Sequence, residues 1–356
     1  MRARPSFESS DQAFTLALRT KVDAFFVNKS RFADGRMIAK TVFFLGSTAA
    51  LWAVLVTGLV SGLWGLPVAM LLGAFVAFIG FNVGHDAGHG SYSSNRLVNR
   101  VLATTFDLLG ASSANWARAH NVIHHTYTNV PGVDHDLDPG PFLVFAPKAN
   151  PARIFRWQHV FAFLLYGFTH LVWVFKKDFV QSADVRLTGK SPSRRDVVGM
   201  VLGKLVHLGV FLGVPMLVGH WAWWQVLVGY VAMSAMTGVT LAVVFQLAHV
   251  VEGPAFPTVE HGHLRGGFAS HQLRTTANFA TDSALASFFL GGLNHQVEHH
   301  LLPGVSHIHY AALAPIVKQT ALEHGLPYLE NGSFAQALGS HVRTLKRLGR
   351  PRLATH

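Results

Sequence analysis

The feature that most constrains this chain is a pair of long apolar blocks that contain no charged residue. One block covers residues 41–84 and the other covers residues 205–251. A single membrane-crossing helix needs about 20 residues, so each block is long enough for two crossings. Glycine and proline interrupt the first block at residues 61–67, and proline, glycine and tryptophans interrupt the second at residues 213–224. The pattern predicts an all-α integral membrane protein whose four transmembrane helices form two hairpins, at about residues 41–61, 66–84, 198–218 and 223–248.

Composition favours the same class of protein. Half of the residues are hydrophobic and only 13% are charged, whereas a soluble domain carries about a quarter charged residues. The core helices of a soluble protein rarely run for roughly 40 residues without a charge, so we exclude that alternative. The expected organisation is a cytoplasmic N-terminal segment at residues 1–40, a membrane domain at residues 41–330 and a basic C-terminal tail at residues 331–356.

The basic residues predict the orientation in the membrane. The chain has 29 Lys and Arg against 18 Asp and Glu, and the basic residues avoid the two predicted hairpin loops. By the positive-inside rule, both termini and the long polar segments face the cytoplasm, and the predicted location is the inner membrane. An apolar run at residues 160–175 is predicted to lie in the cytoplasmic interface as a helix. No basic stripe with interleaved aromatics is present, so nucleic acid is not an expected partner.

Histidine is the unusual residue in the composition. The chain has 22 histidines and no cysteine, so any metal must be bound through nitrogen or oxygen. His85 and His89 follow the first apolar block, and their spacing puts both imidazoles on one face of a helix. His120 and His124 repeat this spacing, and His125 would be turned by about 100° around an α-helix, toward a neighbouring metal.

A third cluster and an isolated histidine complete the set. His299 and His300 form another doublet, and His249 ends the last predicted span, as His85 ends the second. One ion takes roughly four to six ligands, so eight imidazoles predict two metals. Zinc would normally use an HExxH helix, which is absent, and nitrogen-rich ligation favours iron, with copper second. The eight candidate imidazoles are those of His85, His89, His120, His124, His125, His249, His299 and His300.

At these motifs the chain resembles the membrane fatty acid desaturase family, from about residue 41 to residue 328. The segment Gln296-Val-Glu-His-His-Leu-Leu-Pro303 is similar to the third histidine box of front-end desaturases, where glutamine replaces the first histidine. Residues 121–129, 134–139, 271–276 and 307–310 agree with bacterial linoleoyl-CoA-desaturase-type members. The resemblance implies four membrane helices under a helical cytoplasmic cap, with a histidine-ligated di-iron site and a narrow acyl tunnel.

The resemblance also bears on individual ligands. Family members carry a ligand at the cytoplasmic end of the fourth membrane helix, which matches His249. Gln296 takes the position of a ligating histidine, so it binds through its carbonyl, binds through water or leaves an open site. His295 is the alternative ligand, because it stands four residues before His299. Two carboxylates inside the boxes, those of Asp86 and Glu298, are expected to orient imidazoles.

The expected reaction is dioxygen-dependent desaturation of a fatty acyl chain, as an acyl-CoA or an acyl-lipid, with two irons as the cofactor. A membrane di-iron hydroxylase or ketolase of a lipid or carotenoid would share nearly the same ligands, and a non-enzymatic membrane metal-binding protein is a more distant alternative. The chain shows no His-Pro-Gly-Gly haem motif. Electrons are therefore expected from a separate ferredoxin, flavodoxin or cytochrome b5-like protein.

Overall fold

The computed structural model describes residues 4–8, 10–183 and 192–351. The remaining parts of the predicted terminal segments, residues 1–3, 9 and 352–356, lie outside the described residues. The chain forms two compact units, and each is considered by itself. Unit 1 comprises Met1–Arg31, Ala119–Ala162 and Val244–His356, and unit 2 comprises Phe32–Arg118 and Phe163–Val243.

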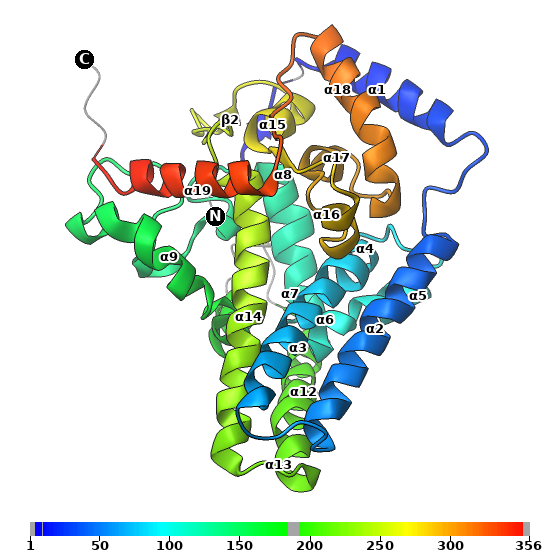
Figure 1. Cartoon of the computed structure of the whole chain (residues 1–356). Coiled ribbons are helices and arrows are strands. Elements are labelled where there is room, and N and C mark those ends of the chain that lie inside the picture. Colours follow the sequence, from blue (N-terminus) through cyan, green and yellow to red (C-terminus); the bar gives the residue numbers. More distant parts are fainter. Residues whose placement is uncertain (1–3, 9, 184–191, 352–356) are drawn as a thin grey trace. The chain divides into compact units, whose positions relative to one another are not determined.

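Unit 2 contains the membrane-length helices (Figure 1). Four helical stretches of the described chain are long and apolar enough to cross a bilayer, which confirms a multi-pass membrane protein. They are Gly35–Val56 (α2); Gly62–Gly88, built from η1 (Gly62–Trp64), α3 (Gly65–Ile79), η2 (Gly80–Gly84) and α4 (His85–Gly88); Arg194–Val218, built from α12 (Arg194–Leu208), η9 (Gly209–Gly213) and α13 (Val214–Val218); and Trp223–His249 (α14), whose last residues belong to unit 1.

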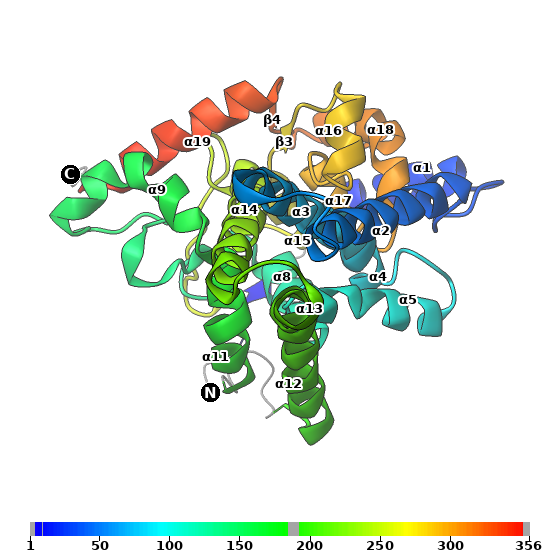
Figure 2. The same ribbon diagram turned by 60° about the horizontal axis from the view of Figure 1, so that its bottom comes forward.

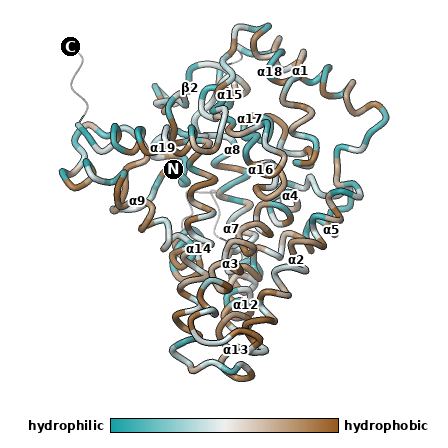
Figure 3. The backbone as a smooth tube through the Cα atoms, in the orientation of Figure 1, coloured by the Kyte–Doolittle hydropathy of each residue, from teal (hydrophilic) through white to brown (hydrophobic). Residues whose placement is uncertain are grey.

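Hydropathy along the backbone agrees with this assignment, because apolar residues dominate these helices (Figure 3). Two tryptophans, one in α2 and one in the turn between α13 and α14, make indole hydrogen bonds inside unit 2. Trp52 Nε1 donates to the carbonyl of Val210 at 3.0 Å, and Trp221 Nε1 donates to the carbonyl of Leu55 at 2.7 Å. Each bond satisfies an indole N–H that would otherwise be costly in a membrane.

Helix α3 approaches α14 closely at a glycine. A Cβ on Gly73 would lie 2.1 Å from the carbonyl oxygen of Met233, so no larger residue fits without movement of a backbone. The close contact between α3 and α14 also allows the hydroxyl of Thr237 to donate to the carbonyl of Gly73 at 2.9 Å. Small residues and hydroxyl bonds of this kind let membrane helices pack tightly.

Shorter helices connect the membrane spans within the chain. The predicted interfacial run forms two helical stretches, Arg153–Tyr166 and Thr169–Ala183, which are bent by 70° at the break and pass as a membrane span only together. Their placement in the interface therefore remains a prediction. The short elements of this part of the chain are α5 (Arg96–Ala103), α6 (Thr105–Leu108), α7 (Ser113–Trp116), η3 (Ala117–His124), α8 (His125–Tyr127), η4 (His135–Leu137), η5 (Gly140–Phe142), η6 (Arg153–Trp157), α9 (Gln158–Tyr166), α10 (Thr169–Val172), η7 (Trp173–Lys177) and α11 (Asp178–Ala183).

Unit 1 has its own hydrophobic core. Phe14 and Leu18 of the N-terminal helix pack with Leu273, Val297 and Leu313 from three later helices, and all are buried. Figure 2 gives a second view of these helices. The helices that contribute to unit 1 beyond residue 250 are α15 (Phe268–Thr275), α16 (Ala284–Phe289), α17 (Gln296–Leu301), η10 (His307–His309), α18 (Tyr310–Glu323) and α19 (Phe334–Leu348), and the N-terminal helix is α1 (Gln12–Phe25).

The structure is mostly helical, and within its described residues four very short strands depart from the all-α prediction. The strands β1 (Ser6–Phe7) and β2 (His263–Leu264) pair in parallel, as do β3 (Asn278–Phe279) and β4 (Glu330–Asn331). Each strand has two residues, which is too short to leave an alternating hydrophobic pattern in the sequence. They join distant segments of unit 1 without forming an extended sheet.

The contact between α3 and α14 can be tested with Gly73→Ala. We expect the variant to lose about 1–3 kcal/mol of stability, because the added methyl group must displace the backbone of Met233. The measurement is the midpoint of thermal unfolding of the purified chain in detergent. Gly46→Ala in α2 is the matched control, since a Cβ there would have no atom within 4 Å. An unchanged midpoint for Gly73→Ala would contradict the close packing.

Candidate metal centre

The first histidine pair lies at the end of a membrane span in unit 2. The imidazoles of His85 and His89 are 4.7 Å apart between ring centroids, so the predicted pairing on one helix face is present. Trp116 packs edge-on against both rings, at 5.5 Å and 5.4 Å. A Cβ on Gly88 would lie 2.2 Å from the Trp116 ring, which explains the glycine between the two histidines. The pair is thus held against an aromatic wall.

The second cluster, in unit 1, lies on a helix that is wound more loosely than predicted. Residues 117–124 form a π-helix, η3, in place of the expected α-helix. Because a π-helix bonds residues i and i+5, it brings His120 and His125 together instead of turning them apart. Their Nε2 atoms are 3.2 Å apart, and the rings of His120 and His124 stack at 5.1 Å. The expected α-helical winding is therefore wrong, whereas His125 does join a donor group separate from those that contain His124.

Histidines from two other segments of unit 1 meet this cluster. The ring of His249, at the end of α14, lies 4.8 Å from that of His124 and 5.0 Å from that of His300. His299 lies 4.5 Å from His125, and His300 lies 4.3 Å from the same ring. Six histidines predicted as ligands from three distant segments are therefore buried in one place.

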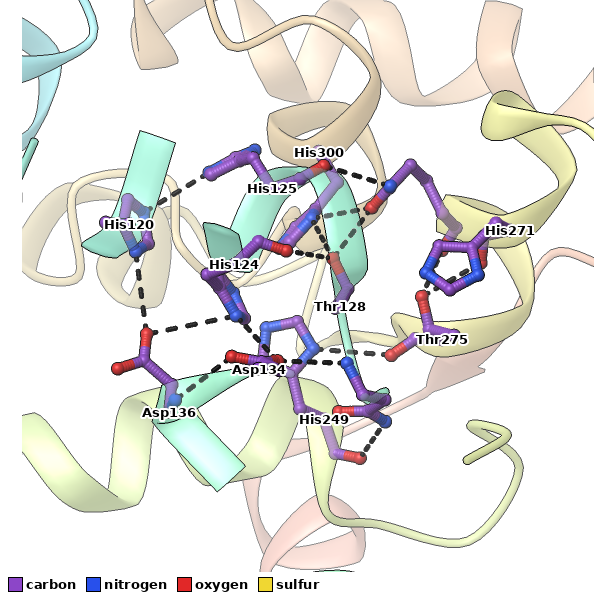
Figure 4. Close-up of polar contacts among 12 residues, drawn as sticks. His120, His124, His125, Thr128, Asp134, Asp136, His249, His271, Thr275 and His300 are labelled. Atoms are coloured by element: carbon purple, nitrogen blue, oxygen red, sulfur yellow. Dashed lines mark hydrogen bonds and ion pairs between the residues drawn. The ribbon is translucent and has the colours of Figure 1, made fainter. Parts of the chain in front are cut away.

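Acceptors around the cluster determine which ring nitrogen carries the proton. The Nδ1 atom of His249 lies 3.3 Å from the carbonyl of Thr275 (Figure 4). Nδ1 of His300 lies 3.0 Å from the side-chain oxygen of Gln272. A carbonyl oxygen only accepts, so both Nδ1 atoms donate and the neutral rings keep a lone pair on Nε2. In His249 this Nε2 is buried and has no hydrogen-bond partner among the described residues. A metal would satisfy it.

Two aspartates act on the second cluster. Nδ1 of His124 donates to Asp134 at 3.1 Å (Figure 4). The same carboxylate accepts the backbone N–H of Asn129 at 2.9 Å. Asp136 lies 3.8 Å from Nδ1 of both His120 and His124. Burial lowers the pKa of His120 to about 4, although Asp136 opposes this shift. The ring is therefore neutral near pH 7, as metal ligation requires.

Gln272 connects two of the boxes. Its oxygen accepts from His300, and its Nε2 donates to the backbone carbonyl of His125 at 3.0 Å. Tyr310 plays a similar part for His299, since its hydroxyl lies 3.3 Å from Nδ1 of that ring. Metal-ligating histidines usually have such a partner on the second ring nitrogen, because it holds the ring orientation and the tautomer.

The donor atoms in unit 1 fit a metal centre. Three groups of three donors have their candidate ligand atoms within 4.8 Å of one another, and two of these groups contain only imidazoles. The buried nitrogen donors suit iron, copper or zinc. The chain has no cysteine, so metal centres that are bound through thiolates are excluded. The groups are His124, His249 and His300; His125, His299 and His300; and His120, His124 and Asp136.

The remaining predicted site residues lie around α17. Gln296 is buried and begins this helix, three and four residues before His299 and His300. His295 precedes the helix with a non-helical backbone, and its Nε2 lies 3.3 Å from the hydroxyl of Ser287. Among the described residues, His295 joins none of the converging donor groups.

The two box carboxylates have partners of their own. Glu298 accepts from Asn278 at 2.8 Å and from Tyr328 at 2.9 Å, and burial raises its pKa to about 7. These bonds tie α17 to β3 and to the segment before β4, while the imidazoles of His299 and His300 are oriented by Tyr310 and Gln272. Asp86 is buried in unit 2 within electrostatic reach of Lys40.

The sequence prediction missed the residues that orient the rings. They are Asp134, Asp136, Gln272, Thr275 and Tyr310. All five belong to segments that agree with the family pattern, at residues 134–139, 271–276 and 307–310. The family pattern therefore pointed to these segments, but only three-dimensional contacts link each residue to a particular imidazole.

Comparison with known proteins places the chain among desaturases. The family model described as fatty acid desaturase matches residues 61–332. An acyl-lipid (8-3)-desaturase of Physcomitrium patens is 34% identical over 351 residues, which cover 96% of this chain and 73% of that protein. An sn-1 linoleoyl-lipid 6-desaturase of Synechocystis sp. is 35% identical over 346 residues, covering 95% of this chain and 96% of that protein. A protein of the same name in Arthrospira platensis is 32% identical over 321 residues, covering 88% of this chain and 85% of that protein.

The role of Gln272 can be tested with Gln272→Leu, which removes the three hydrogen bonds of its side chain, to Thr128, His300 and the His125 carbonyl, at similar volume. We expect metal affinity to fall by about tenfold to a hundredfold, because the His300 ring loses the partner that fixes its orientation. The measurement is metal content of the purified chain across a titration of free metal. Gln319→Leu, at an exposed glutamine, is the control. Unchanged affinity in Gln272→Leu would contradict the assigned role.

Proposed function

Because this chain belongs to the fatty acid desaturase family, we propose that it desaturates a fatty acyl chain with dioxygen and two irons held by its histidine boxes. The observation that carries the proposal is the convergence of imidazoles from residues 120–125, His249 and residues 299–300 on one buried place. Two bound irons would supply the oxygen activation and electron transfer that side chains cannot provide. The bilayer around the membrane helices supplies an apolar substrate.

We assign nine ligands to the two irons. Seven of them lie in unit 1, and His85 and His89 of unit 2 enter from the sequence pattern and the family resemblance. Gln296 is preferred to His295 because it lies inside the helix that carries His299 and His300, whereas the ring of His295 is engaged by Ser287. The assigned ligands are His85, His89, His120, His124, His125, His249, Gln296, His299 and His300.

The residues of the chain have three tasks in this reaction. The imidazoles must stay neutral, which burial promotes at His120. Their rings must keep one orientation, which Asp134, Gln272 and Tyr310 provide through hydrogen bonds to Nδ1. The site must also exclude water, and the buried second and third boxes meet this need.

For the substrate, we propose an acyl group of a membrane lipid, desaturated between an existing double bond and the carboxyl end. Support comes from the names of the relatives, which are acyl-lipid and linoleoyl-lipid desaturases, and from glutamine at the start of the third box. The proposed topology is two helical hairpins in the inner membrane, with the boxes facing the cytoplasm. The desaturase domain covers about residues 41–330, between a cytoplasmic N-terminal segment and the basic tail.

Electrons are proposed to come from a separate acidic protein, such as a ferredoxin, a flavodoxin or a cytochrome b5-like protein. The support is the net charge of +11, which favours an encounter with a negatively charged partner. Exposed basic residues of unit 1 suited to this contact are Lys148, Arg153 and Arg156.

The reaction can be tested by expressing the chain in a host that is supplied with candidate fatty acids. We expect a new double bond in the fatty acid methyl esters, detected by mass spectrometry, and its loss in His125→Ala by at least about a hundredfold because a metal ligand is removed. Full activity of His125→Ala would contradict the ligand assignment. If the product carries a hydroxyl group instead of a double bond, the chain is a hydroxylase. If no product forms with any of several electron-donor systems, the result counts against both desaturation and hydroxylation.

The ninth ligand can be tested with Gln296→Ala and His295→Ala. We expect Gln296→Ala to lower iron affinity by about tenfold, in the range measured for polar groups that support a metal. His295→Ala should leave iron affinity unchanged, since its contacts are with Ser287 and Glu298. The measurement is the number of irons per chain at several free-iron concentrations. The opposite pattern would assign the ligand to His295.

A further inference from the structure

The loop that precedes the second histidine box is held by buried polar side chains in unit 2. His207 lies 3.0 Å from the carbonyl of Leu108 through Nδ1, and His170 lies 2.9 Å from the carbonyl of Leu109 through Nε2. The ammonium of Lys204 donates to the next carbonyl, that of Gly110, at 2.6 Å. Three successive carbonyls are thus bound by side chains from α10 and α12.

An ion pair completes this arrangement. Lys204 pairs with the carboxylate of Asp178 and donates its third hydrogen to the carbonyl of Trp173 at 3.1 Å. The Asp178 carboxylate accepts the backbone N–H of Ser112 at 2.8 Å and the indole N–H of Trp173 at 3.2 Å. Both charged side chains are buried, and Lys204 lies within a membrane-length helix.

Burial of such a pair costs free energy, because both charges lose their hydration. Charged residues inside membrane spans are rare and usually serve a function. Lys204 and Asp178 are not among the proposed metal ligands. Their bonds converge on residues 110–112, immediately before the helix that carries the second box.

The helix that starts there is fixed at its first turn. Ser112 is its N-cap and accepts from the backbone N–H of Asn115. The side chain of Asn115 donates to the backbone carbonyl of Asp178 at 2.9 Å and lies 2.8 Å from the hydroxyl of Ser182. α7 then continues without a break into η3, which carries His120 and His124.

The same turn also supports the first box. Trp116, the last residue of α7, packs against the rings of His85 and His89 within unit 2. A shift of this turn would therefore move the aromatic wall of one histidine pair and the start of the helix that carries the other. A loosened turn is expected to weaken metal binding because metal affinity depends on ligand orientation.

We propose that Lys204 and Asp178 form a positioning clamp. The clamp fixes the first turn of the helix that carries the second box, and through Trp116 it fixes the ring that packs against His85 and His89. The inference rests on the proposed function, in that the boxes must hold metal. The clamp does not touch the metal or the substrate. It acts on backbone groups at residues 110–112 and on the aromatic wall.

The test is the double variant Lys204→Met with Asp178→Leu in the full chain. Removing both charges avoids the uncompensated buried charge that either single change would leave. We expect a folded chain whose affinity for iron(II), and for cobalt(II) as an optical probe, falls by about tenfold to a hundredfold. A purely structural pair would lower the unfolding midpoint of the metal-free chain but leave the affinity of the folded fraction unchanged.

Two further variants make the result decisive. Asn115→Ala cuts the link between α7 and α11 without burying a charge, and a severalfold loss of metal affinity is expected. It decides the question if the double variant does not fold. Lys21→Met with Glu323→Leu is the matched control, because it removes an exposed lysine–carboxylate pair at 2.6 Å and should leave metal affinity unchanged.

The outcomes separate the clamp from the proposed function. If the unaltered chain binds no metal, the proposed function fails. If it binds metal and a folded double variant keeps its affinity within about twofold of the unaltered chain, far less than the expected tenfold to hundredfold loss, the clamp is overturned. Wild-type affinity in Asn115→Ala, with a double variant that does not fold, overturns it as well.

Discussion

The candidate centre depends on hydrogen bonds from imidazole Nδ1 to fixed acceptors. A neutral imidazole has one N–H and one lone pair, so a bond at Nδ1 determines that Nε2 faces the metal. Asp134, Gln272 and Thr275 each provide such an acceptor, and they come from two segments far apart in the chain. The packing of unit 1 therefore has a chemical consequence, because it places each acceptor beside its ring and so sets which ring nitrogen is left for a metal.

Much of this arrangement is predictable from the sequence. The uncharged blocks at residues 41–84 and 205–251 predict four membrane-length helices, because each block is long enough for two crossings and soluble core helices rarely run so far without a charge. The histidine spacings predict the pair at His85 and His89, and His249 is predicted from its place at the end of a span. These features are local, or depend only on where a helix ends, so a single sequence displays them.

Other features arise only from tertiary contacts. The amino-acid composition of residues 117–124 is equally compatible with an α-helix, so nothing in the sequence indicates the wider turn of the π-helix. The wider turn brings the rings of His120, His124 and His125 together in one buried site, which is a tertiary feature. Gln272 is likewise an ordinary polar residue in sequence, and it acquires a role because α15 packs beside the second and third boxes.

The surplus of histidine has a related explanation. His170 and His207 have no place among the ligands, yet both are buried and bind the backbone just before the second box. A membrane protein must satisfy carbonyls within its own structure, and a buried imidazole N–H does this without adding a net charge. Lys204 performs the same task at the next carbonyl but brings a charge, which is why Asp178 must accompany it. Where the backbone leaves regular helix near the boxes, this chain therefore uses polar side chains from neighbouring helices to hold it.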